Sequence, residues 1–325
     1  MAVRKTESRL PAGMQANDLG QAVTNGGVAL VSYLTAPLAS TRQQTYVLFV
    51  TDTALHPQIT GYSWTFTLNG TPTPIQSTTG LQTFTPTVEG TLQIDVQAQD
   101  NGGTAVASAS LTQQVGPLNP ELESLIANTD ANAPIAGHPD TTRELINDLR
   151  LWIDGQLPPG DTEDGRLNRL ILAISYAESL HVPPLRREVH LDRISDLLEA
   201  GRFDELVSEA EEGLGVCQLR PRLLAMSLEN NGQSLIPWTL LPADTAERVA
   251  ALNPIYTAFN GLSQEDKIDI FNRLRFPKTN VLMCQTMLQK VRQQLFGGQA
   301  WSVLLADQTL AGQLLRHFNE GPLQP

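Results

Sequence analysis

Apolar and polar residues alternate along several segments in the first third of the chain. Residues 64–68 place an apolar side chain at every second position and stop at Asn69-Gly70, a dipeptide typical of tight hairpin turns. Residues 92–98 repeat the alternation, and segments of similar character flank these runs at 46–50 and 104–115. Because sheets with one apolar face each bury those faces together, the pattern predicts an antiparallel β-sandwich.

A different pattern begins near Thr141, where apolar residues recur at helical spacing. The clearest case is the segment 166–180, whose apolar residues form a stripe along one helix face. Residues 181–212 also carry apolar side chains at helical spacing. The C-terminal half is therefore expected to be mainly α-helical.

The length of 325 residues suits two domains, because domains cluster near about 100 to 150 residues. We expect an N-terminal tail over residues 1–25, the β-sandwich over 26–116, a linker over 117–140 and the helical domain over 141–325. The linker is assigned from its richness in Asp, Asn, Ala, Pro and Gly. The predicted fold class is a multidomain β + α protein.

The composition is that of an ordinary globular protein, with 41% hydrophobic and 17% charged residues. The formal net charge is -12, and no run of Lys and Arg stands out. Nucleic acids and anionic lipids are bound through basic patches, so neither is expected as a partner. A glycan remains compatible, because sugars are recognised mainly through hydrogen bonds and stacking.

Cys217 and Cys284 are the only cysteines, which gives neither a disulfide framework nor the spacing of a metal site. Both stand in apolar helical contexts, so we expect buried free thiols, no metal and no cofactor. The first residues lack the apolar core of a signal peptide, and no window approaches the length of a membrane span. A soluble product of the cytoplasm is expected, which reaches a cell wall by another route.

Glu178 is the strongest candidate for chemistry. It stands four residues after Ile174, on the apolar face and near the C-terminal end of the predicted helix. Burial and the negative end of the helix dipole both favour the neutral acid. A protonated carboxylic acid is what cleavage of a glycosidic bond requires of its proton donor. A salt bridge at the helix end is the alternative role.

Four segments resemble, in the same order, motifs of lytic transglycosylases and goose-type lysozymes. They are Glu178-Ser179, Gly213 to Ala225, Phe276 to Val281, and Phe318 to Pro322. Gly297-Gly298 falls where these proteins break before their last helices. Each segment alone is a short and common string, so the resemblance rests on their joint order. It implies a lysozyme-like helical domain.

The resemblance also implies roles for individual residues. Glu178 would protonate the leaving glycosidic oxygen, and Gln218 would orient an acetamido or hydroxyl group while nearby glycines let the backbone approach the sugar. The residues implied to contact the glycan are Ser179, Gly215, Gln218, Phe318 and Asn319. No second carboxylate is fixed by the motifs; the acidic residues closest to the second motif are Asp204, Glu209, Glu211 and Glu212.

Residues 61–66, 84–92 and 96–100 resemble strands of an immunoglobulin-like or PKD-type domain. Trp64 occupies the place of the tryptophan that this family often carries on its third strand. Its position among alternating apolar residues predicts a core side chain rather than a platform for carbohydrate. This resemblance concerns the fold and says little about function.

Two functions of different class follow. The first is a peptidoglycan-cleaving glycosidase, a lytic transglycosylase or muramidase, whose sandwich attaches to a phage or contractile injection particle or to a cell-surface protein. The second is a catalytically inactive lysozyme-like structural, cargo or glycan-binding protein. Phe318, which replaces a tyrosine of the motif, and the helical segment 181–212, where many relatives carry a hairpin or loop, favour the second.

Overall fold

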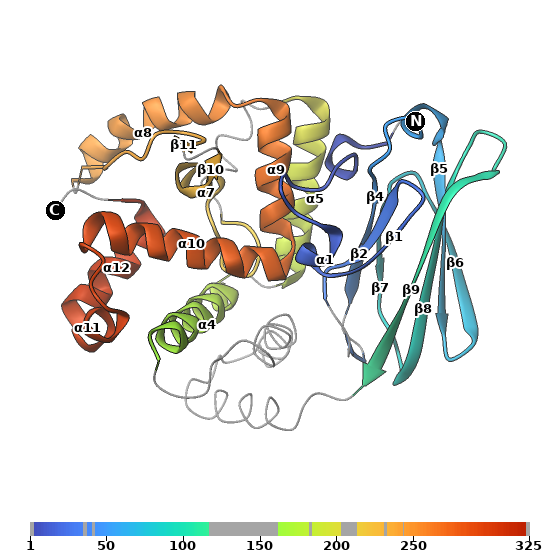
Figure 1. Cartoon of the computed structure of the whole chain (residues 1–325), viewed down its shortest axis with the longest axis horizontal. Helices are drawn as coiled ribbons and strands as arrows, with labels where there is room; N and C mark the ends of the chain where they lie inside the picture. Colours follow the sequence, from blue (N-terminus) through green and yellow to red (C-terminus); the bar gives the residue numbers. More distant parts are fainter. Residues whose placement is uncertain are drawn as a thin grey trace. The chain divides into compact units, whose positions relative to one another are not determined.

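The computed structural model describes residues 3–34, 38–40, 43–116, 162–181, 184–202, 213–230, 233–242 and 244–322. The chain divides into two compact units. The first consists of Met1–Leu151 with Phe276–Thr279, and the second of Trp152–Arg275 with Asn280–Pro325. The described part of the first unit is rich in β-strands and that of the second is mainly helical (Figure 1).

The described part of the first unit contains two sheets. One has the order β1-β2-β4-β7, formed by Gln21–Asn25, Val28–Ser32, Gln44–Val50 and Leu81–Phe84. The other has the order β3-β9-β8-β5-β6, formed by Leu38–Ala39, Ala105–Gly116, Gly90–Gln99, Gly61–Leu68 and Thr71–Ser77. All neighbouring strands are antiparallel except the short β3, which is parallel to β9. The predicted antiparallel β region is confirmed.

Apolar side chains from both sheets form one core between them. Trp64 is fully buried and stacks on Phe66, whose ring centroid lies 4.6 Å from that of Phe84 on the facing sheet. The threonines that alternate with these residues on β5 are only partly buried. The expected core role of Trp64 is confirmed, since the period of two places its ring on the inner face.

The turn between β5 and β6 follows the sequence prediction. Asn69 and Gly70 have φ angles of 50° and 82°, the left-handed values that a two-residue hairpin turn requires. β6 carries Pro72 and Pro74 and lies at the edge of its sheet. Proline has no backbone N–H group and cannot donate a hydrogen bond to a neighbouring strand. An interior strand pairs on both edges, so an edge position suits this segment.

Strands β2 and β4 differ from the expectation of one wet face, because every residue of both is buried. Residues of the segment assigned to a tail contribute to this burial. Ala16 and Leu19 of α1 (Ala16–Leu19) pack on the outer face of the sheet, and residues 21–25 form β1, paired with β2. Closer to the N-terminus, residues Lys5–Glu7 form a 3-10 turn. The carboxylate of Glu7 accepts a hydrogen bond from the Gly80 N–H at 2.7 Å.

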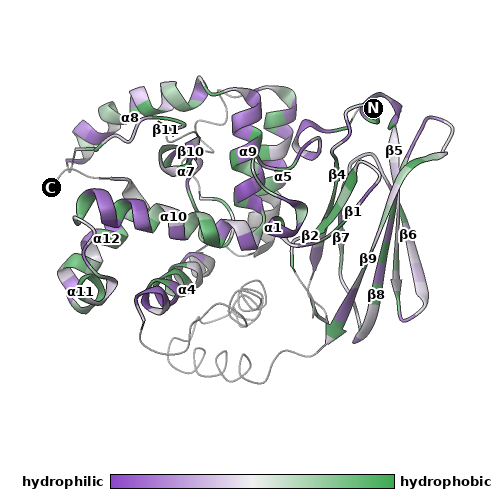
Figure 2. Ribbon diagram, viewed as in Figure 1, coloured by the Kyte–Doolittle hydropathy of each residue, from purple (hydrophilic) through white to green (hydrophobic). Residues whose placement is uncertain are grey.

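The described helices after the β-rich segment are α4 (Glu163–His181), α5 (Pro184–Ala200), α7 (Pro221–Ser227), α8 (Thr245–Asn260), α9 (Gln264–Arg275), α10 (Pro277–Leu295), α11 (Trp301–Ala306) and α12 (Gln308–Glu320). A short hairpin pairs β10 (Glu229–Asn230) with β11 (Gln233–Ser234). Each labelled helix carries both hydrophobic and hydrophilic residues (Figure 2). The predicted helical region is confirmed. None of the described helices is long and apolar enough to cross a lipid bilayer.

The predicted signals at the ends of α10 hold. The helix begins at Pro277, whose fixed φ suits a first helical turn. It ends before Gly297 and Gly298, which both have positive φ. Trp301 then opens α11 and is 2% exposed, with the guanidinium of Arg292 5.0 Å from its ring centroid.

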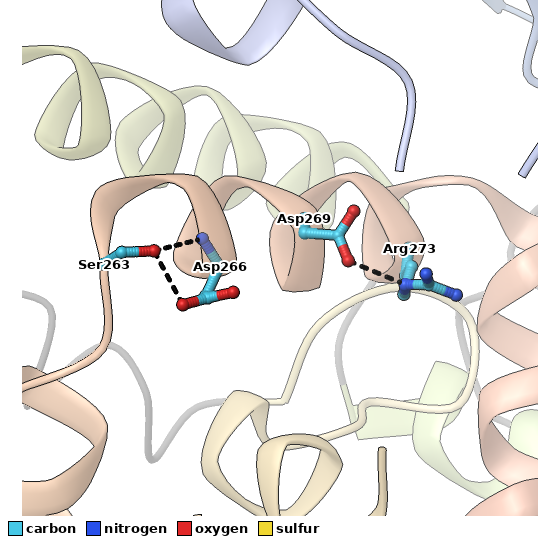
Figure 3. Close-up of polar contacts among 4 residues, drawn as sticks. All are labelled: Ser263, Asp266, Asp269 and Arg273. Atoms are coloured by element: carbon cyan, nitrogen blue, oxygen red, sulfur yellow. Dashed lines mark hydrogen bonds and ion pairs between the residues drawn. The ribbon is translucent and has the colours of Figure 1, made fainter. Parts of the chain in front are cut away.

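Helix α9 is stabilised by side chains of its own (Figure 3). At its N-terminus the Ser263 hydroxyl accepts a hydrogen bond from the Asp266 N–H and donates one to the Asp266 carboxylate. One helical turn separates Asp269 from Arg273, and they form an ion pair at 3.2 Å. These contacts fix a helix that ends at Arg275, beside residues of the candidate site.

Several predictions fall outside the described residues. They include the linker over 117–140, the onset of helix at Thr141, and the four acidic candidates at 204, 209, 211 and 212. Within the segment 181–212, helix α5 agrees with the predicted helical spacing.

Candidate functional site

The second motif forms a tight turn between Leu214 and Leu219. Their backbone groups exchange two hydrogen bonds of 2.9 and 3.0 Å, and the Gln218 N–H donates to the Gly215 carbonyl at 3.2 Å. Gly215 and Gln218 both have positive φ, 71° and 48°. Glutamine rarely adopts the left-handed region, so the surroundings must hold Gln218 in this conformation.

The glycines of this motif are explained by packing within the protein. A Cβ atom on Gly213 would lie 2.1 Å from the Gln218 carbonyl oxygen, and one on Gly215 would lie 2.2 Å from Asn280 Nδ2 and 2.4 Å from the Leu274 carbonyl oxygen. We expected these glycines to let the backbone approach a sugar. In the structure they make room for the protein's own polar groups.

Asn280 connects the third motif to this turn. Its Oδ1 accepts a hydrogen bond from the Cys217 N–H at 2.8 Å, and its Nδ2 donates to the carbonyls of Leu214 and Leu274 at 2.9 Å each. Asn280 is 0% exposed. Segments 63 residues apart in the sequence are therefore joined by a buried amide.

Glu178 lies in the C-terminal part of α4, the helix that contacts the same turn through Ser175. Ser175, one helical turn earlier, is fully buried, and its hydroxyl lies 3.0 Å from the Cys217 sulfur. Burial raises the pKa of the Cys284 thiol well above its ordinary value. A hydrogen bond with Cys217 and the charges of Cys217 and Glu178 raise this pKa further. Glu178 itself is half-buried. The acid therefore borders a buried cluster of Ser175 and the two thiols.

Helix α4 is also tied to α10 directly. Gln285 Nε2 donates to Asn168 Oδ1 at 2.8 Å, and Asn168 is 5% exposed. Both cysteines are buried free thiols, as expected. No group of three or more His, Cys, Asp or Glu residues in the described parts of the chain is arranged to hold a metal ion.

The fourth motif packs against α7, the helix that follows the turn. Phe318 is 4% exposed, and the Pro322 carbonyl accepts a hydrogen bond from the Leu241 N–H at 2.6 Å. Gly321 has a φ of 98°, and a Cβ there would lie 3.4 Å from Leu223 of α7. His317, next to Phe318, contacts Phe296 edge to face, with 5.7 Å between ring centroids.

The predicted site residues thus have different positions. The segments carrying Glu178, Gln218 and Asn280 meet around one turn in the second unit, whereas Phe318 belongs to the packed interior. The side chains of Ser179 and Asn319 lie outside the described residues. The role of Asn280 was missed, although an asparagine in an apolar helix is a signal, because it is unfavourable there unless its amide has partners.

No family model matches this chain, and no curated protein or solved structure shows significant similarity to it.

Proposed function

We propose that the helical unit is a lysozyme-like, peptidoglycan-cleaving glycosidase in which Glu178 is the general acid. The observation that carries the proposal is that three of the four motifs, which are dispersed along the sequence, meet around the Leu214–Leu219 turn. The Cys217 N–H is held by Asn280, and the Cys217 sulfur contacts Ser175, one turn before Glu178. Gly321 of the fourth motif lies close to Leu223 of α7, the helix that begins at Pro221. Unrelated short strings would have no reason to adjoin one turn.

The proposed chemistry begins with proton transfer from Glu178 to the oxygen of the glycosidic bond, which breaks as the leaving sugar departs. Water in a muramidase, or the C6 hydroxyl of the same sugar in a lytic transglycosylase, then attacks the anomeric carbon. The proton that the attacking O–H loses returns to the Glu178 carboxylate, which restores the acid. Gln218 is proposed to orient the substrate, because it is half-buried whereas the other residues of the Leu214–Leu219 turn are buried.

The β-rich unit is proposed to be an immunoglobulin-like attachment module. Its two packed antiparallel sheets and the buried Trp64 support this assignment. Such a module suits attachment to a phage or contractile injection particle or to a cell-surface protein, which would bring the helical unit to a bacterial wall.

A second candidate is an inactive glycan-binding or structural protein of the same fold. One observation favours it: Phe318 stands where the motif has a tyrosine, and its buried ring supplies no hydroxyl. This function needs Gln218 but not Glu178.

Purified wild-type protein and a Glu178→Gln variant incubated with insoluble peptidoglycan distinguish the two candidates. We expect the wild type to release soluble muropeptides and the variant to be slower by about 100- to 10,000-fold, the usual contribution of a general acid. Products lighter by one water than the hydrolytic ones would indicate the transglycosylase reaction. Asp164→Asn, which removes an exposed carboxylate at the other end of α4, should retain wild-type rates.

The outcomes are separable. No release by the wild type, or equal release by the wild type and Glu178→Gln, would contradict the enzymatic function. Sedimentation of an inactive wild type with peptidoglycan would support the second candidate.

A further inference from the structure

We propose that Asn280 is a positioning residue for Gln218: it holds the Leu214–Leu219 turn in the shape that presents the Gln218 amide to a glycan. The inference rests on the proposed function for the identity of the ligand. The positioning itself is a property of the protein alone and can be tested without a ligand.

The first argument is that Asn280 uses its amide fully. Both N–H groups donate to backbone carbonyls, one at the start of the turn on Leu214 and one at the end of α9 on Leu274, while Oδ1 accepts from Cys217 inside the turn. The two carbonyls need donors and the Cys217 N–H needs an acceptor, so only a side chain that has both can satisfy all three groups. Asn280 therefore fixes both the conformation of the turn and its position next to the end of α9.

The second argument concerns strain. Gln218 has a φ of 48°, a conformation that costs free energy for a residue with a Cβ. The contacts around Gln218 must stabilise the folded turn enough to offset that cost. The backbone N–H of Cys217, the preceding residue, donates a hydrogen bond to Asn280. At Gly215 the turn packs so closely on the Asn280 amide that there is no space for a Cβ atom. Without Asn280, Gln218 would relax toward negative φ and its side chain would change direction.

The third argument is that the strained conformation leaves part of the Gln218 amide available. Its Nε2 donates to the Gly215 carbonyl at 2.7 Å, which fixes the direction of the side chain. In the described part of the chain no partner is seen for Oε1, and the side chain is half-buried. An amide with a fixed orientation and a free acceptor suits the N–H of an acetamido group or a sugar hydroxyl.

The first measurement needs no ligand. In ¹⁵N-labelled protein, the side-chain amide signals of Gln218 are identified by their loss in Gln218→Ala. We expect them to lie away from the region of free glutamine amides in the wild type and to move toward that region in Asn280→Ala. Asn168→Ala removes a comparable buried amide contact, with Gln285, and should leave the Gln218 signals in place.

Because Asn280→Ala removes three hydrogen bonds and could prevent folding, Asn280→Asp is the second variant. It has nearly the same shape and keeps the acceptor for Cys217 but lacks both donors. We expect the Gln218 signals to move in the same direction. Unchanged Gln218 signals in a folded Asn280 variant would overturn the proposal.

The second measurement is binding of a soluble β-1,4-linked N-acetylglucosamine oligosaccharide, in a Glu178→Gln background that prevents turnover. Gln218→Ala and Asn280→Ala should each weaken binding about tenfold, as expected for roughly one hydrogen bond. The double variant should bind no more weakly than either single one, because Asn280 acts through Gln218.

Additive losses in the double variant would overturn a role exerted through Gln218. If the oligosaccharide does not bind to any variant while the amide signals shift as expected, the positioning role stands and the proposed glycan function fails. The two claims are thus separated by the same set of proteins.

Discussion

Two residues of one turn, Gly215 and Gln218, have left-handed backbone conformations, but for different reasons. Gly215 has no Cβ, and the space that a Cβ would occupy is filled by Asn280 and the Leu274 carbonyl. Gln218 has a side chain and is held in place by its neighbours. The Leu214–Leu219 turn is therefore tightly packed, and Gln218 is its one residue that is half-buried rather than buried.

Gly215→Ala should destabilise the helical unit by about 2 to 4 kcal/mol. The estimate combines the cost of a left-handed alanine with that of overpacking, because the new Cβ would clash with a buried amide and a backbone carbonyl. Urea unfolding of the full chain measures the loss. Gly297→Ala is the control: Gly297 also has a positive φ, 59°, but no atom lies within 4 Å of its Cβ position. It should cost about 1 kcal/mol, and equal losses would contradict the packing argument.

At the scale of elements, helix α4 is anchored at the end opposite to Glu178. Glu163, in its first turn, accepts hydrogen bonds from the backbone N–H groups of Trp301 and Ser302, at the start of α11. A carboxylate there satisfies N–H groups that have no partner within the helix and interacts favourably with the helix dipole. This contact joins the start of α4 to the start of α11.

The contact should make the stability of the protein depend on pH. Hydrogen bonds from the Ser302 side chain and from the two backbone N–H groups hold the pKa of Glu163 below its ordinary value. A lowered folded pKa means that the stabilisation is present above the unfolded pKa of about 4.3 and is lost as the pH falls through the folded pKa. Glu163→Gln should therefore lower the melting temperature near pH 7 and have a smaller effect at acidic pH.

Asp164→Asn tests this interpretation, because it removes the adjacent carboxylate, which makes none of the hydrogen bonds to α11. Melting curves of the wild type and both variants between about pH 3 and 7 suffice. The same pH-dependent loss in both variants would show that total charge, and not the contact to α11, is responsible.

The two cysteines of the protein both lie in the helical unit, so their reactivity measures how often that unit opens. Cys217 and Cys284 are both 0% exposed and belong to the helical unit. Labelling of a thiol requires an exposed thiolate, so reaction with a disulfide reagent requires that this unit opens. The raised pKa of Cys284 lowers its thiolate fraction further.

We expect both thiols of the folded protein to react with a soluble aromatic disulfide at pH 8 at least about 100-fold more slowly than in denaturant, as an opening free energy of about 3 kcal/mol implies. A Val303→Cys variant provides an exposed control, because Val303 is 53% exposed. Its added thiol should react at the rate of a free cysteine. Rapid reaction of the two native thiols would contradict their burial beneath the site.

The sequence predicted those features that depend on local pattern. The alternation in 64–68 and 92–98 predicted strands, because a period of two places one set of side chains on the buried face. Asn69-Gly70 predicted the hairpin, and Pro277 and Gly297-Gly298 predicted the ends of α10, because each of these residues restricts or permits particular φ values by itself. The order of motifs around Glu178 likewise needed no coordinates.

Other features were decided only by tertiary structure. Residues 21–25 look irregular in isolation and become a strand because β2 offers an edge to pair with. β2 and β4 are buried on both faces because a separate segment covers the outer one. The positions of Cys217 and Asn280 depend on a hydrogen bond that spans 63 residues. Local pattern records which face a residue prefers, whereas the partner that satisfies a buried amide or strand edge comes from distant sequence, and only the folded chain brings it near.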